Sequence, residues 1–350
     1  MARRKTRARI AQFMREITIA GGGLAGLSLA CALRLRGVPV TVMEASHYPR
    51  HRVCGEFISG VTAETLGFLG IRELFDDVRK HTSVCWFENG RVMHRDTLPE
   101  PALGISRFEL DERLRLRVEA LGGIVKTNTR ARPVPAEGFV WAAGRRPRTG
   151  PWIGLKAHIR GLTMTTDLEM HAGRNGYAGL AGVEEGWMNV CGLFRLDRQL
   201  DATGADLLPA YLEAGGNREL AALLRRAEWR DGSFSAVAGF ELGRQVVVPG
   251  LLCLGDAESM IPPFTGNGMS MAFQAAECVC APLVSWAHGD HTWLATENQC
   301  RSLLAHRFRR RLAVAQLLHR VLLGTSGRSL LQTLSSARIL PFKPVLSLVR

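Results

Sequence analysis

The chain has 350 residues, of which 46% are hydrophobic, 22% are charged and 37 are glycine. This length and composition exclude a disordered, collagen-like or coiled-coil protein, and also a minimal module with one small core. We expect two interlocked domains, or one domain with a helical appendage.

The formal net charge of +13 is concentrated at the two ends of the chain. Residues 1–16 carry +5 and residues 297–350 carry +9, so the 280 residues between them sum to −1. A nearly neutral body argues against nucleic acid as a partner. An anionic membrane surface is the better candidate partner for the ends, and residues 1–16 are expected to be a disordered basic leader.

The eight cysteines are scattered, without a CxxC pair or a Cys/His cluster at zinc spacing. No apolar run reaches the roughly 18 residues of a membrane-spanning helix, and the basic N-terminus lacks the apolar stretch of a signal peptide. We therefore expect a cytoplasmic protein without a metal, at most bound peripherally at the inner membrane surface.

The strongest local pattern is ITIAGGGLAGLSLACALRLRGVPVTVMEA, which covers residues 17–45. It predicts a buried strand, a glycine turn, an amphipathic helix that ends at Gly37, and a second strand that ends at Glu44. This order of elements is one βαβ unit.

Three glycines in the turn have the G-x-G-x-x-G spacing of a dinucleotide-binding site. Gly21 allows the tight turn, Gly23 lets a pyrophosphate approach the backbone, and Gly26 lets the helix pack on the strand. Glu44 follows Gly21 by 23 residues, where a carboxylate can accept hydrogen bonds from both ribose hydroxyls of an adenosine. Together they favour dinucleotide binding over a structural glycine turn. The predicted cofactor contacts of this unit are Gly21, Gly23, Leu24, Ala25, Gly26 and Glu44.

A hairpin and a helix are predicted next. Residues 82–95, TSVCWFENGRVMHR, place an Asn-Gly pair between two apolar runs, which is typical of a hairpin. Ser106 and Glu109 have the spacing of a helix-capping box. The apolar stripe of that helix consists of Leu110, Leu114, Val118 and Leu121.

A second domain is predicted over residues 153–244. Short strands at 161–171, 176–183 and 186–194 are separated by glycine-rich turns, which is typical of an antiparallel sheet. Such a sheet, joined by the hairpin, can cover a bound cofactor. Each aromatic or aliphatic candidate for the substrate pocket fits a core position as well. These candidates are Tyr177, Leu180, Phe194, Phe240 and Phe264.

Residues 250–273, GLLCLGDAESMIPPFTGNGMSMAF, predict a buried strand, a turn with Asp256, and a long helix from Gly268. An Asp at a strand end can bind a ribityl hydroxyl, and the helix directs N–H groups toward the pyrimidine edge of a flavin. The segment resembles the second FAD motif of the para-hydroxybenzoate hydroxylase and geranylgeranyl reductase superfamily. The resemblance implies FAD contacts from Gly255, Asp256, Pro263, Gly266, Gly268 and Met269.

Three further segments extend the resemblance to about residues 17–295. YPRHRVCGEFIS, residues 48–59, resembles the loop beside the flavin ring in geranylgeranyl reductases, and the matched residues are Cys54, Gly55 and Glu56. The resemblance implies that Cys54, with Gly55, lies near the reactive flavin face, either as a weakly acidic catalytic thiol or as a small packing group. Arg50 and Arg52 would face phosphate or substrate.

In this superfamily an arginine at the position of Arg107 approaches FAD. FVWAAGRRPR, residues 139–148, resembles the strand and turn that close the FAD domain with Gly144. The Asp usually found beside that glycine is missing, and the preceding hairpin is shortened to residues 131–138. Contacts around residues 143–148 therefore stay open.

The resemblance implies an α/β fold, in which a Rossmann-like FAD-binding domain is interrupted by an antiparallel β-sheet substrate domain. The segments 17–81, 105–152 and 245–295 would form the FAD domain, 82–104 and 153–244 the substrate domain, and 296–350 basic C-terminal helices. Apolar helical runs flank the arginines at 309–311 in the last segment. We favour a helical layer packed on the FAD domain with solvated arginines over a membrane-surface helix.

The resemblance leaves two reactions open. In the favoured one, NAD(P)H reduces non-covalently bound FAD, oxygen forms a flavin C4a-hydroperoxide, and a hydrophobic aromatic or polyketide-type substrate is hydroxylated. In the other, as in geranylgeranyl reductases, the flavin delivers hydride to a prenyl double bond. Cys54-Gly55 favours reduction, whereas residues 177–179, Tyr-Ala-Gly, lack that family's Tyr-x-Trp and favour hydroxylation. Without a second Rossmann glycine motif, a nicotinamide docks transiently or another donor acts.

Overall fold

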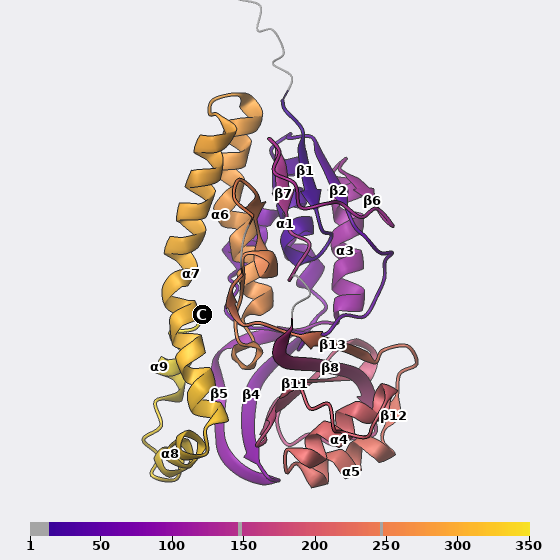
Figure 1. Cartoon of the computed structure of the whole chain (residues 1–350), viewed down its shortest axis with the longest axis vertical. Coiled ribbons are helices and arrows are strands. Elements are labelled where there is room, and N and C mark those ends of the chain that lie inside the picture. Colours follow the sequence, from indigo (N-terminus) through magenta and orange to yellow (C-terminus); the bar gives the residue numbers. More distant parts are fainter. Residues whose placement is uncertain (1–13, 146–148, 246–247) are drawn as a thin grey trace, which may run out of the picture.

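The computed structural model describes residues 14–145, 149–245 and 248–350. It places two large β-sheets one beyond the other, with a long helix running beside both (Figure 1). A small third sheet pairs β14 (Gly243–Arg244) with β16 (Ser259–Met260). Most of the predicted basic leader lies outside the described residues. Among the helices of the described ranges, none combines the length and the apolar character needed to cross a membrane.

The first sheet is parallel and has five strands. Its central strands are apolar runs such as Ile17, Ile19, Val40 and Val42, all of which are buried, as is typical of a sheet covered on both faces. In spatial order the strands are β15 (Leu252–Cys253), β7 (Phe139–Trp141), β1 (Ile17–Ala20), β2 (Val40–Met43) and β6 (Ile124–Lys126).

Helix α1 (Leu24–Leu35) packs against both α3 (Arg107–Ala120) and α6 (Gly268–His288). At the start of α3, Ser106 Oγ accepts a hydrogen bond from Glu109 N at 3.0 Å, as the capping box predicts. The reciprocal half of the box was predicted wrongly, because Ser106 N donates to Glu184 at 2.9 Å. A residue far away in the sequence thus replaces the local partner.

The second sheet contains nine strands and includes the hairpin predicted around Asn89-Gly90. The sheet is antiparallel except where β4 and β9, which belong to different passes of the chain, pair in parallel. Along the main path the strands are β12 (Glu228–Trp229), β8 (Gly150–Arg160), β11 (Met188–Arg195), β10 (Gly176–Gly182), β9 (Leu168–Ala172), β4 (Arg79–Glu88), β5 (Arg91–Gly104) and β3 (Phe57–Ile58), and β13 (Ser235–Gly239) pairs with β8.

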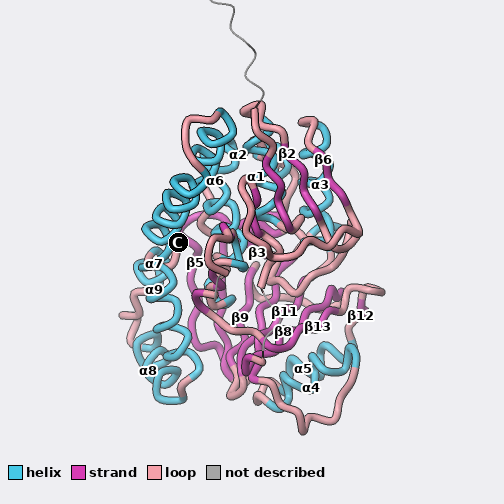
Figure 2. Tube along the Cα trace, turned by 45° about the horizontal axis from the view of Figure 1, so that its top comes forward, coloured by secondary structure: helices cyan, strands magenta, loops and turns pink. Residues whose placement is uncertain are grey.

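One face of this sheet is covered by α4 (Leu207–Ala214) and α5 (Arg218–Arg226), which lie together at the end of the molecule away from α1 (Figure 2). Tyr211 and Leu224 are buried there against strand residues such as Leu155. The sequence analysis did not predict these two helices.

The C-terminal segment forms α7 (Trp293–Leu323), α8 (Thr325–Ser336) and α9 (Phe342–Ser347). As the layer interpretation predicts, α7 packs on α6, but α8 and α9 continue onto β5 of the second sheet (Figure 2). Two arginines of this segment are buried rather than solvated, because the layer gives them acceptors. Arg311 donates to Gln274 at 2.7 Å and Arg328 to Glu88 at 2.5 Å.

No disulfide joins any of the eight cysteines. The remaining helices, strands and turns are short. They are α2 (Ala63–Leu69), β14 (Gly243–Arg244), β16 (Ser259–Met260) and the 3₁₀ turns Arg72–Phe75, Glu184–Gly186, Gly204–Asp206, Gly255–Ala257 and Pro263–Thr265.

Candidate active site

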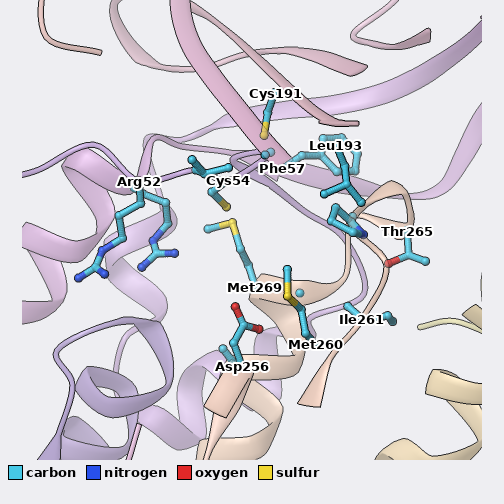
Figure 3. Close-up of a pocket in the computed structure, with 18 of the residues that line it drawn as sticks. Arg52, Cys54, Phe57, Cys191, Leu193, Asp256, Met260, Ile261, Thr265 and Met269 are labelled. Carbon is cyan, nitrogen blue, oxygen red and sulfur yellow. The ribbon is translucent and has the colours of Figure 1, made fainter. Parts of the chain in front are cut away.

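A cavity of about 1030 Å³ is lined by residues of both sheets (Figure 3). It brings together predicted contacts that are up to about 250 residues apart in the sequence. Of the predicted cofactor residues, Gly26 is the one that does not line it. Those in the wall are Gly21, Gly23, Leu24, Ala25, Glu44, Arg50, Arg52, Cys54, Gly55, Arg107, Gly144, Gly255, Asp256, Pro263, Gly266, Gly268 and Met269.

Each of the three glycines in the first motif is required, or suited to its position, for a different physical reason. Gly21 has φ +108°, and a Cβ there would lie 2.3 Å from the carbonyl oxygen of Ala142, which directly follows β7. A Cβ at Gly26 would lie 2.0 Å from the Gly21 oxygen, so this glycine serves helix packing. A Cβ at Gly23 would meet only Arg107, at 3.7 Å, so the backbone here faces open cavity. A pyrophosphate can approach at Gly23.

Glu44 directly follows β2, and its carboxylate holds the surrounding loop together. Its Oε2 accepts a hydrogen bond from Gly22 N at 2.9 Å, and its Oε1 accepts from Ser46 N at 3.0 Å. Arg50 pairs with Oε1 at 2.9 Å and Arg52 with Oε2 at 3.4 Å. The two arginines line the cavity, yet both donate to protein carboxylates.

Asp111 is a functional residue that the sequence analysis missed. Its buried carboxylate binds Arg107 through two hydrogen bonds of 2.7 and 2.8 Å and Arg52 through one of 2.9 Å. Burial alone would lower the pKa of Arg107, but the charge of Asp111 raises it above its usual range. The i,i+4 spacing of Arg107 and Asp111 was the available signal. A permanent cation is thereby held beside Gly23.

Cys54 lies on the side of the cavity formed by the second sheet, near Cys191 (Figure 3). Burial raises the pKa of the Cys54 thiol, with Arg107 opposing the shift. The group is therefore a neutral thiol at pH 7. It can donate a weak hydrogen bond or pack, but it is not a nucleophilic thiolate.

The residues present fit FAD. The Asp256 carboxylate projects into the cavity and makes no hydrogen bond or ion pair within the described ranges, so it is available for a ribityl hydroxyl (Figure 3). Burial raises the pKa of Asp256, while Arg107 and Arg145 lower it. Helix α6 starts at Gly268 in the same wall, with the unpaired N–H groups of its first turn. When bound, FAD would supply the redox chemistry that protein side chains lack.

Only part of the predicted substrate pocket is present. Tyr177, Phe240 and Phe264 line the cavity. Leu180 and Phe194 were predicted wrongly, because their side chains are buried on the opposite face of the sheet, against α4 and α5. Successive strand residues point to opposite faces, so a position three residues after Tyr177 cannot share its face.

The predicted contact region around residues 143–148 is described only in part. Gly144 lines the cavity, and the Arg145 guanidinium lies 4.0 Å from the centre of the Phe240 ring. Residues 146–148 lie outside the described residues.

The C-terminal helices supply a further wall that the sequence analysis did not anticipate. Asn267 Nδ2 donates to the Val349 carbonyl at 2.6 Å and Arg350 to Ser59 Oγ at 2.7 Å, which fixes the end of the chain on the FAD domain. The apolar runs of the C-terminal segment predicted helices, but they did not indicate that these helices line the cavity. The cavity residues of this segment are Leu318, Val321, Leu322, Leu331, Leu340, Phe342, Val345, Leu346 and Val349.

Two substitutions test the assigned cofactor site. We expect Glu44→Ala to weaken FAD binding by about 1.5 to 3 kcal/mol, roughly 10- to 150-fold in Kd, because the ribose loses its hydrogen bonds. Gly23→Val should exclude FAD, because its side chain would occupy the pyrophosphate path. Flavin fluorescence titration measures both, with the exposed Glu137→Ala as control. Unchanged affinity in both variants would refute the site.

Comparison with known proteins agrees with this geometry. Residues 14–149 match the family model of an FAD binding domain. A menaquinone reductase of Mycobacterium tuberculosis is 23% identical over 345 residues, covering 87% of this chain and 83% of the relative. That of Mycolicibacterium smegmatis is 21% identical, covering 79% and 78%.

Solved structures share the fold at low identity. The flavin-dependent brominase Bmp2 has a TM-score of 0.76 and 16% identity, covering 96% of this chain and 93% of its own. A geranylgeranyl bacteriochlorophyll reductase-like protein of Thermoplasma acidophilum has a TM-score of 0.75 and 15% identity, and the match covers 95% of each chain. The p-nitrophenol 4-monooxygenase PnpA of Pseudomonas putida has a TM-score of 0.74 and 13% identity, and the match covers 96% of this chain and 99% of its own. The chain therefore contains an FAD binding domain over residues 14–149, and it shares its fold with these flavin-dependent and reductase-like proteins.

Proposed function

We propose that this chain is an NAD(P)H-driven monooxygenase that hydroxylates a hydrophobic aromatic or polyketide-type ring carrying a long apolar tail. The observation that carries the proposal is the composition of the cavity wall beyond the predicted flavin contacts. Most of that wall is apolar, with a few polar side chains such as His51, His94 and Tyr177, and its apolar part comes mainly from the second sheet and the C-terminal helices. Bound FAD would supply the activation of oxygen, and an apolar surrounding excludes the water that would divert it.

Two regions of this wall suggest how such a substrate lies. Trp86, Met170 and Leu322 belong to one apolar cluster. Phe342 and Leu346 line the same cavity, so together these side chains suit an alkyl tail.

Tyr177 supports the placement of the ring. Its hydroxyl oxygen accepts a hydrogen bond from Phe264 N at 3.2 Å, which leaves its own proton for a ring oxygen. Burial raises the pKa of Tyr177, so the hydroxyl stays protonated. The Phe264 ring meets Tyr177 edge to face, with centroids 6.1 Å apart, and offers an aromatic surface beside that donor.

A second candidate is the reduction of a carbon–carbon double bond in a prenyl chain. The specific observation for it is that the curated relatives are named menaquinone reductase and match most of this chain. An isoprenoid chain would fit the apolar wall as well as an alkyl tail does.

A nicotinamide reductant is part of the first proposal, and it would dock transiently near the flavin.

One pair of reactions separates the two functions. FAD-loaded protein receives NADPH or NADH and either a long-chain alkylphenol or a prenylated quinone, each with and without oxygen. We expect oxygen-dependent product 16 Da heavier than the alkylphenol, with one NAD(P)H consumed per product. A product that is still 2 Da heavier than the prenylated quinone after its ring has been reoxidised to the quinone, and that forms without oxygen, would replace the first proposal by the second.

A further inference from the structure

A buried cluster of charged residues lies behind the loop that carries Cys54. The side chains of Glu56, Lys156 and His158 are completely inaccessible to solvent. Lys156 Nζ lies 3.2 Å from Glu56 Oε1, and His158 Nε2 lies 2.5 Å from Glu56 Oε2. Glu56 Oε1 also accepts a hydrogen bond from Arg107 N at 2.9 Å. The cluster therefore joins the FAD domain to strand β8.

Burying an ion pair costs desolvation free energy, so the presence of charged residues at these positions calls for an explanation. Lys156 and His158 are two residues apart on β8 and share one face, while their neighbours Leu155 and Ala157 enter the core beneath α4 and α5. Glu56 adopts a left-handed backbone conformation, φ +53°, to meet them. Apolar residues at these three positions would pack without desolvating a charge.

His51 connects the cluster to the cavity. Lys156 Nζ lies 3.0 Å from His51 Nδ1, and His51 lines the cavity wall. An ammonium group donates and cannot accept, so Nδ1 is the acceptor and neutral His51 carries its proton on Nε2. Its ring stacks on Phe108 with centroids 4.7 Å apart. The charged and titratable groups that face it are Lys156, His158, Glu56 and Arg230.

The positive charge of Lys156 disfavours a metal ion at this cluster and favours a role in proton transfer. Ligand atoms of His51, Glu56 and His158 lie within 4.8 Å of one another, a spacing that could hold a metal ion. The Lys156 ammonium already stands between Glu56 and His51, within hydrogen-bond distance of both. A divalent cation in the same space would meet this positive charge at close range.

We propose that His51 passes a proton from the buried Glu56–Lys156–His158 cluster to the cavity and takes it back during turnover. The Nε2 proton of His51 moves to a basic atom in the cavity, and Lys156 transfers a proton to Nδ1. Lys156 is left as a neutral amine, and His51 is left neutral with its Nε2 lone pair toward the cavity. The return step reverses both transfers. The proposal rests on flavin redox chemistry in this cavity, but not on the choice between hydroxylation and double-bond reduction.

The titration of His51 supports this direction of transfer. Burial, together with the charge of Lys156, lowers the pKa of His51 to about 4. His51 is therefore a neutral donor at physiological pH, which a relay through Nδ1 and Nε2 requires.

The first test reads the proton positions by ¹⁵N NMR of histidine-labelled, FAD-loaded protein, with His51→Gln to assign the signal. We expect His51 as the neutral Nε2–H tautomer at all pH values above about 5. Lys156→Met should shift the tautomer toward Nδ1–H and raise the pKa of His51 toward its usual value. Lys156→Gln serves the same purpose if Lys156→Met loses FAD. An unchanged His51 signal in a variant that keeps FAD would overturn the proposal.

The second test needs no substrate. Photoreduced FAD in the protein is reoxidised by oxygen, and the rate is followed at the flavin band across pH and in D₂O. His51→Gln should slow reoxidation at least tenfold and abolish its solvent isotope effect, while the exposed His47→Gln leaves both unchanged. Equal rates in the His51 variant, or stoichiometric Zn²⁺ binding that disappears with His51, would overturn the proposal. Failure of the substrate assays above would leave both of these readouts intact.

Discussion

Deletion of residues 297–350 is expected to yield a protein that aggregates and does not retain FAD. Leu304, Phe308 and Leu322 of α7 are at most 5% exposed, so their removal uncovers the surface of α6 and of the second sheet. The same deletion removes one wall of the cavity. Sedimentation and flavin absorbance of the purified variant measure both losses.

The control for this deletion is Leu317→Ser, which changes a leucine of α7 that is 62% exposed and should leave flavin content unchanged. The opposing hypothesis is a membrane-surface helix, which the basic charge of this segment would suit. It requires salt-sensitive binding of the full-length protein to anionic vesicles, together with a truncated protein that stays soluble and yellow. That pair of observations would contradict the layer interpretation.

Glu56→Leu is expected to lower the free energy of unfolding by about 3 to 5 kcal/mol, because it leaves the Lys156 ammonium buried without its counter-charge. The double variant Glu56→Leu/Lys156→Met should recover most of this loss, since neither charge is then buried alone. Urea unfolding at pH 7 measures all three proteins. A single variant as stable as the parent would show that the pair is not buried in solution.

The same pair predicts a pH dependence of stability. Burial alone would raise the pKa of Glu56, but the hydrogen bond from His158 and the charge of Lys156 lower it below its ordinary value of 4.5. A lowered pKa contributes stability above pH 4.5, and this contribution is lost as the pH falls through the pKa in the folded protein. Urea midpoints at pH 7 and pH 4 should therefore differ less in the double variant than in the parent. An equal difference would exclude Glu56 as a contributor.

The parts of the site that could be predicted from sequence are those made by neighbouring residues. Gly21, Gly23 and Glu44 belong to one βαβ unit, whose spacing in sequence determines its spacing in space. Asp256 could be recognised in the same way, because its strand, turn and helix follow one another directly.

The parts that could not be predicted depend on contacts between distant segments. Glu56 and Lys156 are a hundred residues apart, and neither residue carries a local signal for the other. The face on which Leu180 lies depends on strand register, which follows from the pairing of β10 with β9 and β11. The second wall of the cavity depends on where the end of the chain docks, at Asn267.

The packing of α1 against α6 has a consequence for how the chain acquires its structure. These helices are about 230 residues apart, and the whole second sheet is synthesised between them. β1 likewise has β7 as a neighbour, and β7 in turn needs β15 from after the second sheet. Contacts this distant close slowly, because a long loop must be ordered first. Residues 14–149 alone lack β15 and α6, so we expect the first sheet to remain incomplete until α6 has left the ribosome.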